Sequence, residues 1–281
     1  MIRRIIQTLL AIGFIIYGYF KMSGSEYQKD VVNFGVVGLA TLAELLIEHI
    51  FINRKRLRLL LYVYYLNLKN EHIRFSMSYL YIIKVDDEYL LVRNSNYGHY
   101  QLVGGKYKRL KGTQSLLREK FEAIDDLKLP NKDLMKDDFA LFIPAKKAIK
   151  FLDWFNEGKN REINHWREFY EELIEGKGNL LSKEKFPYVN YNLLGRVTTP
   201  VKRTPGWDCY EILQYDILEL LPNEEQYKEL LNLKSKGDTN YIKWADKELI
   251  NCLGHDKRTK TKLYDIGHHT KWALNMKWEK N

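Results

Sequence analysis

The sequence has little cysteine. Only Cys209 and Cys252 occur in 281 residues, and their spacing matches no metal-binding motif. Two isolated cysteines favour free thiols in a reducing compartment over a disulfide framework.

A strong excess of one charge is also missing from most of the chain. The net charge is +9, but residues 1–58 hold eight of the 45 Lys and Arg and only four of the 36 Asp and Glu. The remainder is therefore mildly basic, which fits an anionic ligand or lipid surface and gives weak support for nucleic-acid binding. We expect no nucleic-acid polymer as partner. The 12 Phe, 20 Tyr and 6 Trp supply enough apolar surface for a real core.

Two long hydrophobic runs are present near the N-terminus. Ile5 to Phe20 follows Arg3 and Arg4, and Val31 to Ile52 follows soon after. Each run approaches the roughly 20 residues that a membrane-spanning helix needs. No convincing small-x-small cleavage site follows the first run, so a removed signal peptide is the weaker interpretation. A single long helix of a water-soluble protein over residues 31–61 stays an alternative.

The charges around these runs predict their orientation. Arg54, Lys55, Arg56 and Arg58 follow the second run, whereas the loop KMSGSEYQKD between the runs is short and balanced in charge. Basic residues at both outer ends place both chain ends in the cytoplasm. We therefore predict a transmembrane hairpin over residues 1–53 with the bulk of the protein inside the cell.

Glu44 and Glu48 interrupt the second run and are four residues apart, so they share one face of a helix. Ionisable groups at membrane depth face a partner or water. Two interpretations stay open. The glutamates line a pore in a self-associating bundle, or they sit at the interface beside the basic residues that follow.

The rest of the chain predicts an α+β domain. Residues 54–72 read as a basic helical connector and residues 73–281 as one layered domain, with strands and helices in irregular order. We expect strands in SYLYIIKVDDEYLLVRNS (with a turn at Asp86-Asp87), YGHYQLVGGKY, DDFALFIPA and CYEILQYDILEL. We expect helices in SLLREKFEAIDDL, residues 163–175, NEEQYKELLNL and KWADKELINCL.

The segment REFYEEL carries the clearest chemical signal. On a helix, Glu168, Glu171 and Glu172 fall at positions i, i+3 and i+4, so their carboxylates project to one side. Like charges that close together need neutralisation, and Mg²⁺ or Mn²⁺ supplies it while also contacting phosphate oxygens. A solvated acidic face is the alternative.

REFYEE resembles the R-E-U-x-E-E core of the Nudix box, and YLLVRNSNYGHYQLVGGKY resembles the strands that precede it in that family. The resemblance covers residues 73–275. It implies an α/β/α sandwich with a mixed sheet, and Glu168, Glu171 and Glu172 as catalytic residues and ligands of Mg²⁺ or Mn²⁺. The box departs from the family pattern, because Gly105 lies 62 positions before Arg167 rather than fourteen, which implies a large insertion. Glu157 and Glu162 are candidates for the first box glutamate.

The order of two hydrophobic helices and then a divergent Nudix domain resembles the CD-NTase-associated (CBASS) membrane effectors of bacterial anti-phage defence. The segment GHHTKWAL, Gly267 to Leu274, resembles the end of the Nudix domain in those effectors. This resemblance implies a homo-oligomer in the bacterial inner membrane that senses a cyclic oligonucleotide, disrupts the membrane and kills the infected cell. The alternative is a membrane-tethered, Mg-dependent pyrophosphohydrolase of nucleoside diphosphate derivatives.

Four further residues are candidates for nucleotide binding. Arg93 follows a strand and could contact phosphate. Tyr97, near His99, could stack on a base. Gly104 and Gly105 could form a turn that lets a ligand approach the backbone. Plain structural roles are the alternative for all four.

Overall fold

A computed structural model describes residues 2–126, 137–162, 164–175, 178–204 and 207–279. The chain divides into two compact units, Met1–Tyr62 and Val63–Asn281. The boundary falls inside helix α3 (Arg54–Leu68), within the predicted basic connector. Cys209 and Cys252, both in described segments, form no disulfide.

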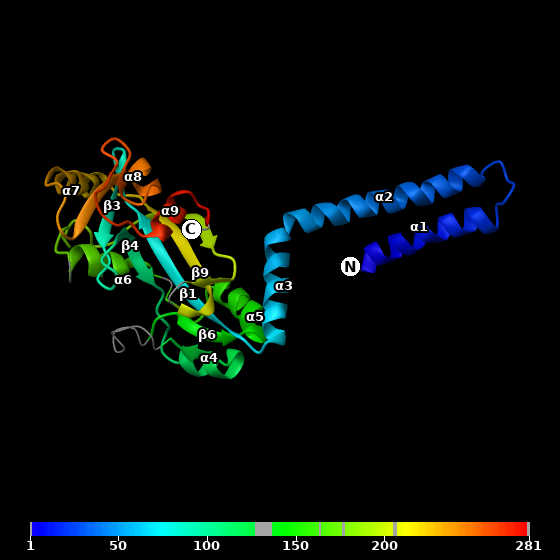
Figure 1. Cartoon of the computed structure of the whole chain (residues 1–281), viewed down its shortest axis with the longest axis horizontal. Helices are drawn as coiled ribbons and strands as arrows, with labels where there is room; N and C mark the ends of the chain where they lie inside the picture. Colours follow the sequence, from blue (N-terminus) through cyan, green and yellow to red (C-terminus); the bar gives the residue numbers. More distant parts are fainter. Residues whose placement is uncertain (1, 127–136, 163, 176–177, 205–206, 280–281) are drawn as a thin grey trace. The chain divides into compact units, whose positions relative to one another are not determined.

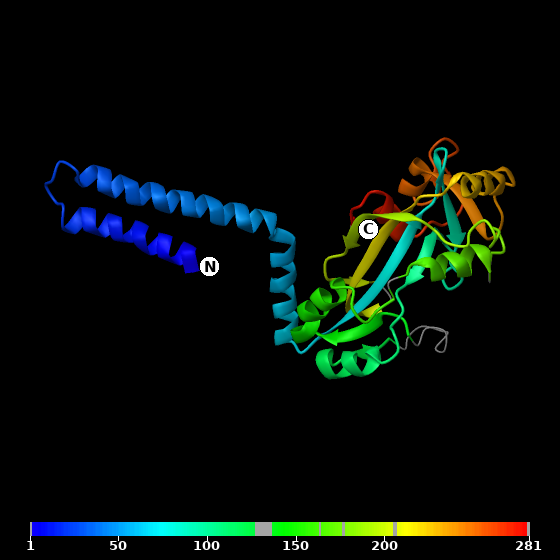
Figure 2. The ribbon, with the colours of Figure 1, turned by 180° about the vertical axis from the view of Figure 1, so that it is seen from behind.

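The first unit is the predicted pair of helices. Helices α1 (Ile2–Phe20) and α2 (Gln28–Ile52) run antiparallel and side by side (Figure 1). Figure 2 shows the same pairing from behind. Among the described residues, α2 alone is long and apolar enough to cross a membrane, and the apolar part of α1 is shorter.

Small residues let the two helices approach closely, as their sequence predicts. A Cβ atom on Gly35 would lie 2.7 Å from the carbonyl oxygen of Ala11. A Cβ atom on Gly18 would lie 2.6 Å from a methyl group of Val32. The rings of Phe14 and Phe34 meet edge to face, with centroids 5.2 Å apart.

The second unit is built on a mixed sheet. Its order is β10-β3-β4-β1-β6-β5, with β2 beside β3, β9 beside β1, and β7 and β8 beside β9. The strands are β1 (His72–Ile82), β2 (Lys84–Val85), β3 (Glu88–Arg93), β4 (Tyr100–Lys106), β5 (Ile124–Asp125), β6 (Ala140–Pro144), β7 (Tyr191–Thr198), β8 (Lys202–Thr204), β9 (Trp207–Leu220) and β10 (Ile242–Asp246). A separate hairpin pairs β11 (His255–Asp256) with β12 (Thr261–Lys262).

Strand β1 is the centre of the sheet. Along one edge it pairs in parallel with β9 over Ile73 to Ile82. Along the other edge its first half pairs with β6 and its second half with β4, both antiparallel. This splayed arrangement confirms the predicted mixed sheet.

The two faces of β1 carry different layers, because side chains alternate along a strand. On one face, Phe75 packs on Phe151 and Tyr81 on Phe169. On the other face, Leu80 and Ile82 join a core that includes Ile250 and Trp272. The helices of the first layer are α4 (Thr113–Phe121), α5 (Ala145–Asn156) and α6 (Trp166–Phe169); those of the second are α8 (Lys247–Asn251) and α9 (His268–Leu274). The predicted α/β/α sandwich is therefore confirmed.

Several predicted elements differ in detail. The segment KWADKELINCL is not one helix, because β10 ends at Asp246, whose side chain accepts a hydrogen bond from the Leu249 N–H and caps α8. The helix predicted over 163–175 begins at Trp166 and becomes a π-helix over Tyr170–Ile174; Ile163 lies outside the described residues. Helix α5 and strand β7 were not predicted. Helix α7 (Glu224–Ser235) begins with a capping box at Asn223, in the predicted segment.

Candidate functional site

The two glycines of the Nudix-like motif lie inside β4 and form no turn, which corrects the sequence prediction. Gly104 has φ +141°, and a Cβ atom there would lie 2.2 Å from the carbonyl oxygen of Tyr79 on β1. A Cβ atom on Gly105 would lie 2.3 Å from the carboxyl carbon of Glu168. Close backbone approach does occur here, and the approaching groups belong to the protein itself.

Arg167 is the centre of the acidic cluster. Its Nη1 donates to Glu168 Oε1 at 2.7 Å and to Glu171 Oε2 at 3.3 Å. Its Nε donates to Glu162 Oε1 at 3.1 Å, and its Nη2 to the carbonyl oxygen of Lys106 at 2.9 Å. One guanidinium thus joins three carboxylates to β4, so the negative charge is compensated within the protein.

Glu172 takes a different partner. Its Oε2 accepts a hydrogen bond from the Gly104 N–H at 2.8 Å, and its backbone carbonyl accepts one from the Tyr241 hydroxyl at 3.0 Å. Glu168 and Glu172 therefore face β4, whereas the side chain of Glu171 is half exposed. The three glutamates are close, as the sequence predicted, but they do not present one open acidic face.

Glu162, rather than Glu157, joins the cluster. Besides Arg167, the Glu162 carboxylate accepts a hydrogen bond from the Lys108 N–H at 3.2 Å. Glu157 lies at the surface beside Lys159. Sequence spacing could not choose between them, because the inserted segment breaks the motif.

Burial affects the acidity of this cluster. Burial raises the pKa of the Glu168 carboxyl, while the adjacent Arg167 guanidinium lowers it. The pKa of the Tyr79 hydroxyl is raised well above its ordinary value, first by burial and then by Glu162 and Glu168. The cluster is therefore a partly desolvated site beside the centre of the sheet.

In this arrangement the carboxylates of the cluster are paired with groups of the protein itself. Within the described segments, no group of three or more His, Cys, Asp or Glu side chains is placed to hold a metal. Arg167 contacts Glu168 and Glu171, and the Gly104 N–H contacts Glu172. Binding of Mg²⁺ or Mn²⁺ by Glu168, Glu171 and Glu172 stays a prediction.

Arg93 and Tyr97 lie away from the glutamates. Arg93 ends β3, and Tyr97 is in the loop before β4; both side chains are exposed. From Tyr100 to Gly104, β4 spans about 13 Å, so these two residues are at the opposite end of the strand from the acidic cluster. Tyr97 stacks on His99, with centroids 5.8 Å apart and planes at 8°, and Tyr97 is 59% exposed.

A partly buried hydrogen-bond chain was missed by sequence reasoning. His165 contacts the Tyr107 hydroxyl through Nε2 at 2.7 Å and the Tyr191 hydroxyl through Nδ1 at 2.9 Å. Tyr107 donates to Asp216 Oδ2 at 2.6 Å, and Arg196 donates to both oxygens of Asp216. Burial lowers the pKa of His165 to about 4. These residues are far apart in sequence and match no motif, so only the fold reveals them.

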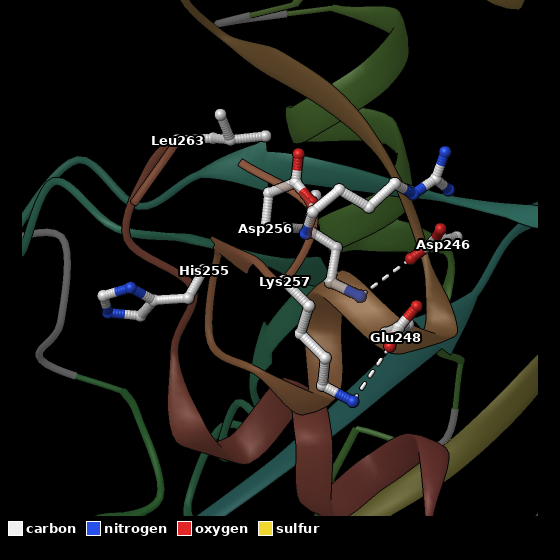
Figure 3. A pocket seen from close by; sticks show the side chains of 8 residues that line it. Asp246, Glu248, His255, Asp256, Lys257 and Leu263 are labelled. Atoms are coloured by element: carbon white, nitrogen blue, oxygen red, sulfur yellow. Dashed lines mark hydrogen bonds and ion pairs between the residues drawn. The ribbon is translucent and has the colours of Figure 1, made fainter. Parts of the chain in front are cut away.

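A pocket lies beside β11 and the start of α8, and Figure 3 shows the side chains that line it. Lys257 pairs with Glu248 at 2.9 Å, and His255 and Arg258 lie nearby (Figure 3). Acidic and basic side chains are mixed here, so the pocket favours no single ligand charge.

Comparison with known protein families identifies the domain that contains this site. The family model described as the SMODS-associated NUDIX domain matches residues 72–274. No curated protein matches the chain. The matched region contains the whole mixed sheet, Gly104-Gly105 and the Arg167 cluster, and it confirms the Nudix resemblance. The chain therefore belongs to the SMODS-associated NUDIX domain family.

Proposed function

We propose that this protein is a membrane effector of a bacterial CBASS anti-phage system. Its Nudix domain binds a cyclic oligonucleotide, and binding drives the helical hairpins to assemble in the inner membrane, disrupt it and kill the infected cell. Both chain ends lie in the cytoplasm in this proposal, where the messenger is made.

The observation that carries the proposal is the covalent coupling of two features. A helix long and apolar enough to span a membrane is followed, after α3, by an SMODS-associated NUDIX domain. Helix α3 begins two residues after α2 ends, so the chain links the domain to the hairpin through α3. A ligand shifts such an equilibrium only by binding one arrangement more tightly than the other.

The Arg167 cluster favours binding over turnover. The carboxylates of the cluster already contact Arg167 and the Gly104 N–H, so an ion would have to share or displace these contacts. The exposed side chains of Arg93 and Tyr97 are suited to a phosphate and a base, respectively.

One observation supports the second candidate, a membrane-tethered, Mg-dependent pyrophosphohydrolase. Glu162, Glu168 and Glu171 all reach one guanidinium, so a change of Arg167 rotamer would release three carboxylates of the kind that hold Mg²⁺.

Binding and turnover can be measured on the full chain in detergent. The protein is incubated with Mg²⁺ or Mn²⁺ and a panel of cyclic di- and trinucleotides and nucleoside diphosphate derivatives. Tight binding without product supports the sensor. Metal-dependent product that Glu171→Gln abolishes and Glu175→Gln spares supports the hydrolase, since both glutamates are exposed but only Glu171 contacts Arg167.

The nucleotide site and the membrane activity have separate tests. We expect Tyr97→Ala to weaken cyclic-oligonucleotide binding at least tenfold, with Tyr188→Ala, another exposed tyrosine, as the control. Full-length protein in dye-loaded vesicles should release dye when the ligand is added. Tight binding with no release under any ligand would reject membrane disruption.

A further inference from the structure

One side of helix α3 is covered within the protein. Val63 and Leu66 are buried, with 6% and 0% of their surface exposed, and Leu59, one turn before Val63, is partly buried. These residues are four and three positions apart, so they form one face of the helix. The rest of the circumference of α3 is free to meet another partner.

A second apolar row on α3 stays largely exposed in the described part of the chain. Leu57, Leu61, Tyr64 and Leu68 are 39%, 62%, 64% and 66% exposed. Their spacing of four, three and four residues again gives one face, rotated about 100° to 160° from Val63. We call these four residues the outer row. At 1.5 Å per residue, the outer row is about 16 Å long.

Cationic side chains border the outer row. Arg54 and Arg58 are rotated about 180° and 220° from Val63, beside Leu61 at about 160°. Both arginines are exposed. No Asp or Glu occurs from residue 49 to residue 70, so α3 carries no acidic side chain. A helix that is apolar along one row and cationic along the next fits a membrane surface with anionic headgroups.

The position of α3 in the chain also favours lipid as its partner. Helix α3 begins two residues after α2, the helix that is long and apolar enough to cross a membrane. In the proposed function α2 does cross it, so the first turn of α3 lies at the level of the headgroups. Tyr62, Tyr64 and Tyr65 follow within α3, and tyrosine is enriched at this level because its ring is apolar and its hydroxyl polar.

We infer that the outer row of α3 is a lipid-binding surface. Helix α3 lies in the plane of an anionic membrane, the outer row faces the boundary between headgroups and acyl chains, and Arg54 and Arg58 contact lipid phosphates. The inference rests on the membrane insertion of α2 in the proposed function, but it needs neither nucleotide binding nor assembly of hairpins. It gives the chain a second, reversible contact with lipid.

Site-specific fluorescence tests this contact. In the full chain with Cys209→Ser and Cys252→Ser, an environment-sensitive fluorophore is attached to Leu61→Cys or to Tyr62→Cys. Tyr62 is also exposed, at 40%, but it is rotated about 260° from Val63, beyond the arginines. In vesicles that contain phosphatidylglycerol, lipids with a quencher near the headgroup should quench the Leu61→Cys label at least threefold more than the Tyr62→Cys label. Equal quenching would overturn the inference.

Iodide in the aqueous phase distinguishes lipid from a protein partner. The Leu61→Cys label should be quenched by the lipid quencher and protected from iodide, because lipid covers it. Protection from both quenchers would show that protein covers the outer row, whether from a second copy or from the same chain, and would reject lipid as its partner.

The preference for anionic lipid has its own test. Vesicles of phosphatidylcholine alone, or the double variant Arg54→Gln, Arg58→Gln, should reduce the lipid quenching of the Leu61→Cys label at least twofold. The double variant Lys257→Gln, Arg258→Gln, at exposed positions between β11 and β12, removes the same charge and should leave the quenching unchanged. Equal quenching in both lipids would reject anionic headgroups as the partner of α3.

A label inside α2 separates this inference from the proposed function. Lipids with a quencher in the middle of the acyl chain should quench a label at Val37→Cys. Such quenching without any lipid quenching at Leu61→Cys would retain the inserted hairpin and reject the lipid contact of α3. No lipid quenching at either position would reject membrane insertion, and with it the proposed function as well.

Discussion

Gly104 allows β4 to lie close to β1 and to the π-helix that carries Glu172. Its φ of +141° suits glycine, and any Cβ would strike the backbone of Tyr79, which cannot move aside as a flexible side chain would. We expect Gly104→Ala to lower the free energy of unfolding by about 3 kcal/mol, from backbone strain and overpacking together.

Gly98 provides the matched control for this substitution. It also has positive φ, at +74°, but nothing lies within 4 Å of a Cβ there. Gly98→Ala should therefore cost about 1 kcal/mol, from strain alone. Urea unfolding of the full chain in detergent, followed by tryptophan fluorescence, measures both. Equal losses would contradict the close contact at Tyr79.

Two partly buried histidines, His165 and His269, make stability depend on pH. Burial lowers the pKa of His165 to about 4 and that of His269 to about 3. Below the ordinary pKa of about 6.5, the unfolded chain takes up protons that the folded chain does not. Their contribution is therefore complete above that pH and is lost as the pH falls toward the folded values.

We expect the free energy of unfolding to fall by about 1.4 kcal/mol per pH unit for each histidine below pH 6.5. Unfolding curves between pH 7 and 5 measure the slope. His165→Gln should make the slope smaller, whereas His255→Gln, at an exposed position, should not alter it. The same slope in the His165 variant would show that this histidine is protonated in the folded state.

At the scale of elements, β1 carries a buried ion-pair network at one end and an apolar core at the other. Arg74 Nε contacts Asp126 Oδ2 at 2.7 Å, and its Nη1 contacts Glu211 Oε2 at 3.0 Å on the parallel strand β9. Leu80 and Ile82 share this face further along the strand. On this face, β1 is therefore held by buried ion pairs at its N-terminal end and by apolar packing at its C-terminal end.

We expect Arg74→Met to lower the free energy of unfolding by about 3–5 kcal/mol, because Asp126 and Glu211 would lose a buried cationic partner. Arg203→Met removes an exposed pair with Asp208 and should cost about 0.5 kcal/mol or less. Chemical unfolding of the two variants under one buffer condition makes the comparison. Similar losses would show that the Arg74 pairs contribute no more than a surface pair.

At the scale of the whole molecule, we expect the helical hairpin to partition into lipid and the second unit to remain in water. The exposed side chains of the hairpin are largely apolar, including Leu9, Ile16, Val37 and Ile52. The full chain should sediment with membranes and resist alkaline carbonate. Residues 54–281 keep α3, whose basic residues favour anionic headgroups, and should be released by high salt.

Fractionation with immunoblotting measures both chains. Release of the full chain by carbonate would contradict membrane insertion. Retention of residues 54–281 after the carbonate wash would show that α3 or the Nudix domain is itself embedded in lipid.

Local patterns in the sequence were sufficient for much of this protein. The apolar runs predicted α1 and α2, because a helix of that length satisfies its backbone internally whatever its neighbours are. Segments rich in Tyr, Ile and Val predicted β1 and β3, and the segment CYEILQYDILEL predicted β9. REFYEE with the paired glycines identified the Nudix family. These features depend on residues that are close together in the chain.

Contacts between segments that are distant in sequence could be identified only from the tertiary structure. Glu162 rather than Glu157 reaches Arg167, the Gly104-Gly105 pair meets Glu168 and Glu172, and His165 joins Tyr107 to Tyr191, because β1, β4 and α6 pack together. No local spacing encodes such distances. Whether a carboxylate is free or paired follows from which side chains the sheet brings within hydrogen-bond reach, and that is a property of tertiary packing alone.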